Sequence, residues 1–471
     1  MEQVPQTEPT ASAQQVDLGS GSVGKLLFRL AVPAIVAQLI NVLYNMVDRM
    51  YIGHLPDVGT AALTGVGVCF PLITAISAFA ALVAMGGAPR ASIFLGRGDK
   101  PTSQRILGNC TTALLGVSVI LTIVFLVFGR QLLMLFGASA DTIDYAWSYL
   151  RIYVLGTVFV QISLGLNAFI NAQGYAKTGM ITVVIGAALN IVLDPIFLFV
   201  FKMGVAGAAL ATIISQAVSA LFVVKFLSSR KSYLRLDPKT MRINPRVLLP
   251  CIALGASPFV MQLTESVISV CFNTQLQRYG GDIAVGAMTI LSSVMQFSML
   301  PLQGLSQGAQ PIASFNYGAG KLDRVLKTFK VLLISCLGYS TLLWAMAVFA
   351  PQIFTGIFTQ SPELAAYTER AMRVYMFASC LFGAQIACQQ TFVALGKALI
   401  SLFLALLRKI ILLVPLIFIL PNFFPADKVT AVFLAEPVAD TLAVLATCTM
   451  FAIIFGKMYK EWKAGKPLKQ T

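Results

Sequence analysis

The chain has 471 residues, of which 57% are hydrophobic and only 11% are charged, and its mean hydropathy is +0.81. A soluble domain carries roughly twice that charged fraction, so the composition excludes an ordinary soluble globular protein. Apolar stretches of about 20 residues, the length that crosses a bilayer, recur along the chain and predict a polytopic membrane protein. The net charge of +15 comes from basic residues scattered over short segments. This pattern argues against nucleic-acid binding and favours contact with anionic lipid headgroups.

The chain begins with a polar segment, 1–23, that lacks the basic and apolar regions of a signal peptide, so we expect a disordered tail. After it, apolar runs and their breakers predict an all-α fold of twelve transmembrane helices in two six-helix bundles. The expected helix limits are 26–52, 60–86, 105–129, 146–172, 179–201, 204–227, 247–275, 283–311, 326–350, 368–395, 398–420 and 429–456. The expected domains are an N-terminal bundle at 24–227, a basic linker at 228–246, a C-terminal bundle at 247–457 and a basic tail at 458–471.

The basic residues predict how these helices are oriented. With twelve spans, both termini lie on the same side of the membrane. Most of the 34 Lys and Arg residues fall in the tails and loops of that side. The excess of positive charge on cytoplasmic segments of membrane proteins therefore predicts that both termini are cytoplasmic.

Spans 1 and 5 each carry one carboxylate inside the membrane, where an ionisable group is costly and is a functional candidate. Asp48 and Asp194 both lie toward the outer ends of their spans, at similar depth. Tyr44 and Asn190 each precede one of these aspartates by four residues and so share its helix face. Thr212 in span 6 adds a hydroxyl. These five residues predict an oxygen-rich site that could hold Na⁺ or share protons between the carboxylates.

Two prolines fall within the same spans, and one alternative stays open for the first aspartate. Pro195 follows Asp194 directly, and Pro33 lies in span 1. Because proline cannot donate a backbone hydrogen bond, we expect both to allow their helices to bend. Asp48 also adjoins Arg49, so an interfacial ion pair is the alternative to a functional role.

A repeat relates the two halves of the chain at a constant offset of 222 residues. The matched positions are Ala91/Ala313, Ser92/Ser314, Gly96/Gly318, Gly98/Gly320, Arg151/Arg373, Tyr153/Tyr375 and Gly174/Gly396. Six spans per half make this a parallel repeat, which suits transport by alternating access. The chain lacks a channel filter motif, and the stretch at 318–321 lacks the other residues of a nucleotide-binding loop. We therefore expect an ion gradient to supply the energy.

The second half also carries charges within its spans: Glu265 in span 7, Arg408 and Lys409 in span 11, and Glu436 and Asp440 in span 12. Glu265 either binds a cationic substrate or neutralises a basic residue of span 11, and the sequence leaves both open. The candidate residues for a substrate cavity are Gln38, Asn45, Met261, Glu265, Met295 and Phe297. The eight cysteines are unclustered and the one histidine, His54, has no clustered partner, so neither a metal centre nor an intramembrane enzyme is expected.

Three motifs make the chain resemble the multidrug and toxic compound extrusion (MATE) family. They are VDRMYIGHL at the end of span 1, NIVLDPIF in span 5 and PLQGLSQGAQPIASFNYGAGK at 301–321. The resemblance implies an antiporter of a bacterial inner membrane that exports cationic, lipophilic compounds in exchange for Na⁺ or H⁺, with no other cofactor.

Within that family, one branch has its cation site in the N-terminal bundle, and Tyr44, Asp48, Asn190, Asp194 and Thr212 match its positions. Pro33 matches the proline at which span 1 bends in the family's transport cycle. A second branch uses a glutamate on span 7 and an aspartate on span 10. Here only the glutamate is present. The alternative function is a flippase for a lipid-linked saccharide, and we expect the protein to act as a monomer.

Overall fold

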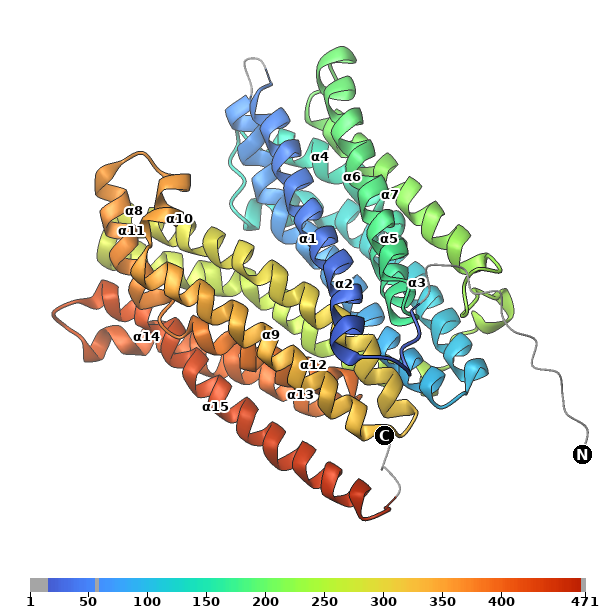
Figure 1. Ribbon diagram of the computed structural model, residues 1–471. Helices are drawn as coiled ribbons and strands as arrows, with labels where there is room; N and C mark the ends of the chain where they lie inside the picture. The colour runs from blue at the N-terminus through green and yellow to red at the C-terminus, as the bar shows by residue number, and fades with distance from the viewer. Residues whose placement is uncertain (1–15, 56–58, 467–471) are drawn as a thin grey trace, which may run out of the picture.

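The computed structural model describes residues 16–55 and 59–466, and the ordered elements within them are all helices (Figure 1). The elements of the first half are α1 Val23–Gly53, α2 Gly59–Gly96, α3 Lys100–Leu135, α4 Ile143–Leu155, α5 Thr157–Ala172, α6 Ala176–Pro195, the π-helix η1 Ile196–Val200, α7 Val205–Ser228 and the short η2 Pro238–Thr240. Those of the second half are α8 Pro245–Gly318, α9 Leu322–Phe349, α10 Gln352–Phe358, α11 Pro362–Tyr375, η3 Ser379–Leu381, α12 Phe382–Ala394, α13 Ala398–Leu406, the π-helix η4 Leu407–Leu413, α14 Val414–Phe423 and α15 Lys428–Lys463.

These helices account for the twelve expected spans. Within the described residues, nine helical stretches are long and apolar enough to cross a membrane, and two bent pairs, α4 with α5 and η3–α12 with α11, pass the same test together. The remaining span is inside α8, whose 74 residues would extend about 110 Å if straight. At Gly281 the backbone adopts φ 66° and ψ −161°, a conformation that favours glycine, and α8 there turns back as two spans.

The spans form two bundles that meet near the beginning of α1 and diverge toward its other end (Figure 1). Helices α1–α7 build the N-terminal bundle, and α8–α15 build the C-terminal bundle. Both ends of α8 pack against the first bundle. The backbone of Gly86 on α2 lies against the carbonyl of Cys251, and that of Gly255 lies against the carbonyl of Leu82. Since a Cβ would not fit at either glycine, the bundles approach here at backbone distance.

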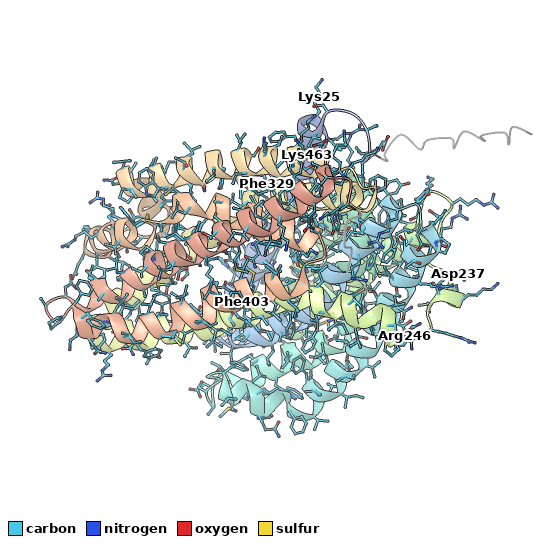
Figure 2. All side chains as sticks on the ribbon, turned by 90° about the horizontal axis from the view of Figure 1, so that it is seen from below. Lys25, Asp237, Arg246, Phe329, Phe403 and Lys463 are labelled. Carbon is cyan, nitrogen blue, oxygen red and sulfur yellow. The ribbon has the colours of Figure 1, made fainter. Side chains whose placement is uncertain are left out.

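Both described chain ends lie at the face where the bundles meet, which we call the terminal face. Figure 2 views the molecule from this side, with Lys25 at the start of α1 and Lys463 at the end of α15. The linker contributes Asp237 and leads to Arg246 at the start of α8. It runs from the end of α7 to the start of α8.

Residues 16–22, which we call the N-terminal strap, differ from the expected disordered tail. The strap crosses the terminal face between the bundles. On one side the carbonyl of Val16 lies against Gly174, in the turn between α5 and α6. On the other side Nδ2 of Asn316, on α8, donates a 2.8 Å hydrogen bond to the carbonyl of Leu18. Residues 1–15 of the expected tail lie outside the described residues.

Candidate functional site

The candidate cation site is formed by three helices of the N-terminal bundle. Asp48 comes from α1, Asn190 and Asp194 from α6, and Thr212 from α7, and all four side chains are buried. The amide of Asn190 donates to Oδ1 of Asp194 at 3.0 Å and to Oγ1 of Thr212 at 3.4 Å. The carboxyl groups of Asp48 and Asp194 lie against each other. The structure therefore brings together the residues that the spacing had placed on shared helix faces.

Three oxygen atoms in this group are buried and lack a hydrogen-bond donor among the described residues. They are Oδ1 of Asp48, Oδ1 of Asn190 and Oδ2 of Asp194. A buried oxygen without a donor costs free energy, and two buried carboxylates side by side cost more because like charges repel. A bound cation would relieve both penalties, whereas a proton shared between the carboxyl groups would relieve their repulsion and serve the two carboxyl oxygens. The set of oxygen ligands suits Na⁺, and the pair of carboxyl groups suits a proton.

The alternative role for Asp48, an ion pair at the membrane interface, disagrees with the geometry. The Asp48 side chain is only 8% exposed. The guanidinium of the neighbouring Arg49 lies instead over the ring of Phe70, 5.1 Å from its centroid. Among the described residues no ion pair joins the two. Asp48 thus faces Asp194 rather than the membrane surface.

A small pocket of about 30 Å³ reaches the cation site from within the N-terminal bundle. Tyr44, Asn190 and Thr212 line it together with a set of polar residues from α1, α5 and α7. Tyr44 is also within electrostatic range of both aspartates. The fifth predicted residue therefore belongs to the same site.

A larger cavity of about 340 Å³ lies between the two bundles and adjoins this pocket. Asn41 and Asn167 line both spaces. The cavity is notable for its amide side chains, which come from both bundles. They are Gln38, Asn41, Asn167, Asn171, Gln262, Gln303, Gln307 and Gln310. No charged side chain is among the described residues that line it.

Of the six predicted cavity residues, Gln38 lines this cavity and the other five lie outside its lining. Met295 packs against two hydrophobic clusters, one within the C-terminal bundle and one that joins the two bundles. Met261 contacts the amide of Gln389 at 3.4 Å, and Asn45 donates to a backbone carbonyl one turn away. Phe297 is 38% exposed and Glu265 forms an ion pair. Residue type alone did not distinguish these positions from the lining.

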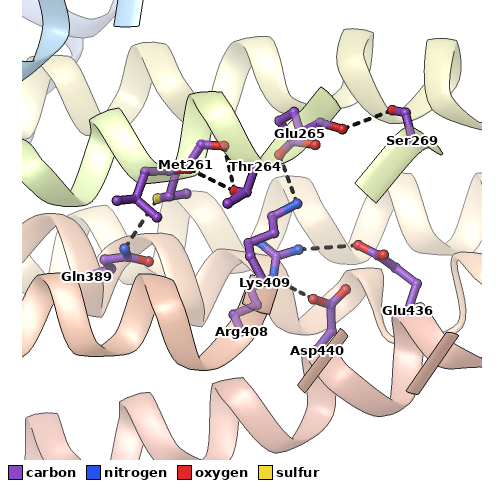
Figure 3. Close-up of polar contacts among 10 residues, drawn as sticks. Met261, Thr264, Glu265, Ser269, Gln389, Arg408, Lys409, Glu436 and Asp440 are labelled. Carbon is purple, nitrogen blue, oxygen red and sulfur yellow. Dashed lines mark hydrogen bonds and ion pairs between the residues drawn. The ribbon is translucent and has the colours of Figure 1, made fainter. Parts of the chain in front are cut away.

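The charged residues of the C-terminal bundle form one network (Figure 3). Nε of Arg408 lies 2.6 Å from Oδ1 of Asp440, and its Nη2 lies 3.7 Å from Oε1 of Glu436. Nζ of Lys409 lies 2.8 Å from Oε1 of Glu265 on α8. Both basic residues are in the π-helix η4, and their acidic partners come from two different helices. Of the two roles left open for Glu265, neutralising Lys409 is the one seen.

A family model described as MatE matches residues 33–196 and 258–419, which is more than half of the chain. The chain belongs to the MatE family. This confirms the resemblance drawn from the three motifs. Proteins of this family are transporters, and the MatE chain described here is accordingly a multi-pass membrane transporter and not an enzyme.

Curated relatives of this MatE chain include multidrug export proteins named MepA from two staphylococci. The protein of Staphylococcus haemolyticus strain JCSC1435 is 26% identical over 424 residues, covering 90% of this chain and 93% of its own. That of Staphylococcus aureus strain MSSA476 is 25% identical over 425 residues, covering 90% of this chain and 92% of its own.

Solved structures with the same fold include transporters in different conformations. An outward-facing multidrug resistance MATE family transporter matches with a TM-score of 0.86 at 23% identity, covering 95% of this chain and 99% of its own. A MATE structure in a bent conformation matches with a TM-score of 0.88 at 22% identity, covering 94% and 98%. At these identities the likeness establishes the fold of two six-helix bundles.

The glutamines of the cavity are the functional candidates that the sequence reasoning missed. Gln303, Gln307 and Gln310 follow one another at i, i+4 and i+7 in a single apolar span. This spacing puts all three on one helix face, and amides repeated on one face of a span indicate a polar surface. That signal was present in the sequence and would have marked the cavity.

Proposed function

We propose that this MatE transporter exports chemically diverse cationic, lipophilic compounds in exchange for Na⁺ or H⁺. The observation that carries the proposal is the trio of buried oxygens on Asp48, Asn190 and Asp194 without donors. Such a site is stable only when a cation or proton is bound. The names of the staphylococcal relatives, multidrug export proteins, support the substrate class.

Exchange follows from the position of the cation site beside the interbundle cavity. The pocket that Asn190 lines and the cavity share Asn41 and Asn167 in their walls. A positive charge that enters the cavity is attracted to the same carboxylates that hold the coupling ion. Binding of one cation therefore weakens binding of the other, and this negative coupling is reciprocal. Loading from outside with the coupling ion releases the compound, and loading from inside with the compound releases the ion.

The direction of export follows from the membrane orientation, which is itself part of the proposal. The bias of basic residues places both termini in the cytoplasm of a bacterial cell, with the protein in the inner membrane. The bundles then meet at the cytoplasmic face and diverge toward the outside, an outward-open arrangement. Rocking of the two bundles, with bending at Pro33 and Pro195 in spans 1 and 5, would expose the same cavity to the other side. One chain contains both bundles, so a monomer suffices.

The flippase alternative is less well supported. A lipid-linked saccharide carries a phosphate-rich headgroup, which basic side chains would bind. The basic residues of the C-terminal bundle, Arg408 and Lys409, are instead paired with carboxylates. The described cavity lining offers neutral amides, which suit a compound held by stacking and hydrogen bonds.

The test is dye export by purified protein in liposomes under an imposed Na⁺ or H⁺ gradient. An inward gradient of the coupling ion should drive ethidium out of the compartment that corresponds to the cytoplasm, and the other ion should not. The double variant Asp48→Asn/Asp194→Asn should abolish driven export while keeping the protein inserted. Gradient-driven export that survives in the double variant would overturn the proposed coupling site.

A further inference from the structure

The charged groups of the C-terminal bundle lie on the three spans that correspond, through the internal repeat, to the spans of the cation site in the N-terminal bundle. In the first bundle they lie on spans 1, 5 and 6, and in the second on spans 7, 11 and 12. The likeness extends to backbone geometry, because spans 5 and 11 each contain a π-helical segment, η1 and η4. Such segments are rare and are often found at functional sites. The repeat thus places a second polar site in the C-terminal bundle.

The two sites differ in one respect, the presence of built-in positive charge. The first site has two carboxylates and no basic partner among the described residues. The second has three carboxylates, Glu265, Glu436 and Asp440, and two basic groups, Arg408 and Lys409. One negative charge therefore remains unmatched within the second site. One further monovalent cation would make the group neutral.

The two basic residues are held differently. Arg408 is bound by Asp440 at 2.6 Å and by Glu436 at 3.7 Å, and its guanidinium lies 5.1 Å from the centroid of the Phe382 ring. It has partners on two sides and is fixed. Among the described residues Lys409 forms an ion pair with Glu265 alone, and its flexible four-carbon chain can move the ammonium group. Glu436 is also within electrostatic range of Lys409 and offers it a second carboxylate.

The carboxylate that pairs with Lys409 is accessible, whereas the ammonium group of Lys409 is buried. The Glu265 side chain is 60% exposed, whereas that of Lys409 is 7% exposed. Gln262, three residues earlier on the same face of α8, lines the interbundle cavity. Glu265 lies one helical turn further along α8, beyond the residues that line the cavity, and its carboxylate is accessible there. Figure 3 shows the ammonium group of Lys409 directed at this carboxylate from the neighbouring helix.

We propose that Lys409 is a tethered cation that competes with a monocationic substrate for Glu265 and moves to Glu436 when the substrate binds. This proposal rests on the proposed export of cationic compounds and assigns the selecting residue. With substrate bound, three carboxylates face three positive charges, and each buried charge has a partner. When the compound leaves, Lys409 returns to Glu265, which prevents an unpaired carboxylate from holding the compound back. Lys409 is thus a specificity-determining residue that acts on release.

The test measures equilibrium binding of tetraphenylphosphonium, a lipophilic monocation, to the purified full-length protein without any gradient. Lys409→Met removes the competitor and should lower the dissociation constant about tenfold or more. Glu265→Gln should raise it by a similar factor. If Lys409 acts only through Glu265, adding Lys409→Met to Glu265→Gln should change nothing further. Lys409→Arg retains the charge and should bind close to the original chain.

The matched control is Lys428→Met, which removes an ammonium group of the same bundle that lies over the ring of Tyr279 rather than in the site. It should leave the dissociation constant unchanged. Transport kinetics should separate substrate binding from substrate release. Lys409→Met should lower both KM and kcat, because the compound binds more tightly and leaves more slowly. Unchanged binding in either Lys409→Met or Glu265→Gln overturns the proposal. Since the aspartates of the N-terminal bundle are intact in every variant, such a result would leave the coupling site standing.

Discussion

Gly96 of the N-terminal bundle packs directly against the carbonyl oxygen of Phe315 in the C-terminal bundle. The repeat partner of this contact is also present, because Gly318 packs against the carbonyl oxygen of Ile93. Each glycine of the pair lies 222 residues from the other, and so do the two carbonyls. The structure thus places the sequence repeat at the seam between the bundles, where the two contacts are related by the internal symmetry.

The seam predicts that Gly318→Ala destabilises the closed terminal face. A Cβ at this position would collide with the carbonyl of Ile93, so the bundles must separate, at a cost of about 1–3 kcal/mol for overpacking. The midpoint temperature of thermal unfolding in detergent and the rate of driven dye export should both fall. Gly338→Ala is the control, because that helical glycine has open space around its Cβ and alanine favours helices. Equal unfolding temperatures and equal export rates in the two variants would contradict the close backbone contact at Gly318.

The N-terminal strap predicts a specific protease sensitivity. Asn316→Ala removes the 2.8 Å hydrogen bond to the carbonyl of Leu18, worth about 1 kcal/mol. Arg324→Ala removes two further bonds of 2.9 Å, to the carbonyls of Ser20 and Gly21. Limited proteolysis should cut the strap several-fold faster in each variant. Asn422→Ala, which loses a long 3.4 Å bond on an exposed turn, should leave the rate unchanged.

The cation site predicts that Asp194→Asn abolishes drug resistance in a host that lacks other efflux pumps. The side chain is fully buried beside Asp48, and an amide can neither release a proton nor balance a bound cation. Minimum inhibitory concentrations should fall to those of cells without the transporter, at equal protein levels in the membrane. Asp144→Asn makes the same change on a side chain that is 78% exposed and should retain resistance. Resistance that persists in Asp194→Asn would remove this residue from the mechanism.

The stability of the first turn of α3 should depend on pH. Hydrogen bonds from the side chain and the backbone amide of Thr102 lower the pKa of Asp99, which caps the helix. Because the folded pKa is depressed, the stabilisation is complete above the unfolded value near 3.8 and is lost as pH falls through the folded value. Asp99→Ala should cost about 1 kcal/mol at neutral pH. Hydrogen exchange at 100–106 should increase in this variant, whereas Asp99→Asn should keep its cap at every pH.

Much of the cation site could be predicted from sequence because its determinants are local. Asn190 and Asp194 are one helical turn apart, so their hydrogen bond follows from helix geometry alone. That Asp48 would meet them required only that two outward-running spans of one bundle place their carboxylates at similar depth. The partner of Lys409 could not be predicted in this way. Glu265, Glu436 and Asp440 all lie within spans, and which of them pairs with Lys409 depended on how α8, η4 and α15 pack.

The amino-acid sequence by itself determined the membrane class, the twelve spans, the repeat and the polar positions of the cation site. These features follow from hydrophobicity, helical periodicity and the cost of burying charge in lipid, all of which act over short stretches of chain. Only the tertiary structure decided that amides of both bundles face one cavity, that residues 16–22 tie the bundles together and that Lys409 pairs with Glu265. Each of these is a contact between segments more than a hundred residues apart, and packing of whole helices fixes which side chains meet.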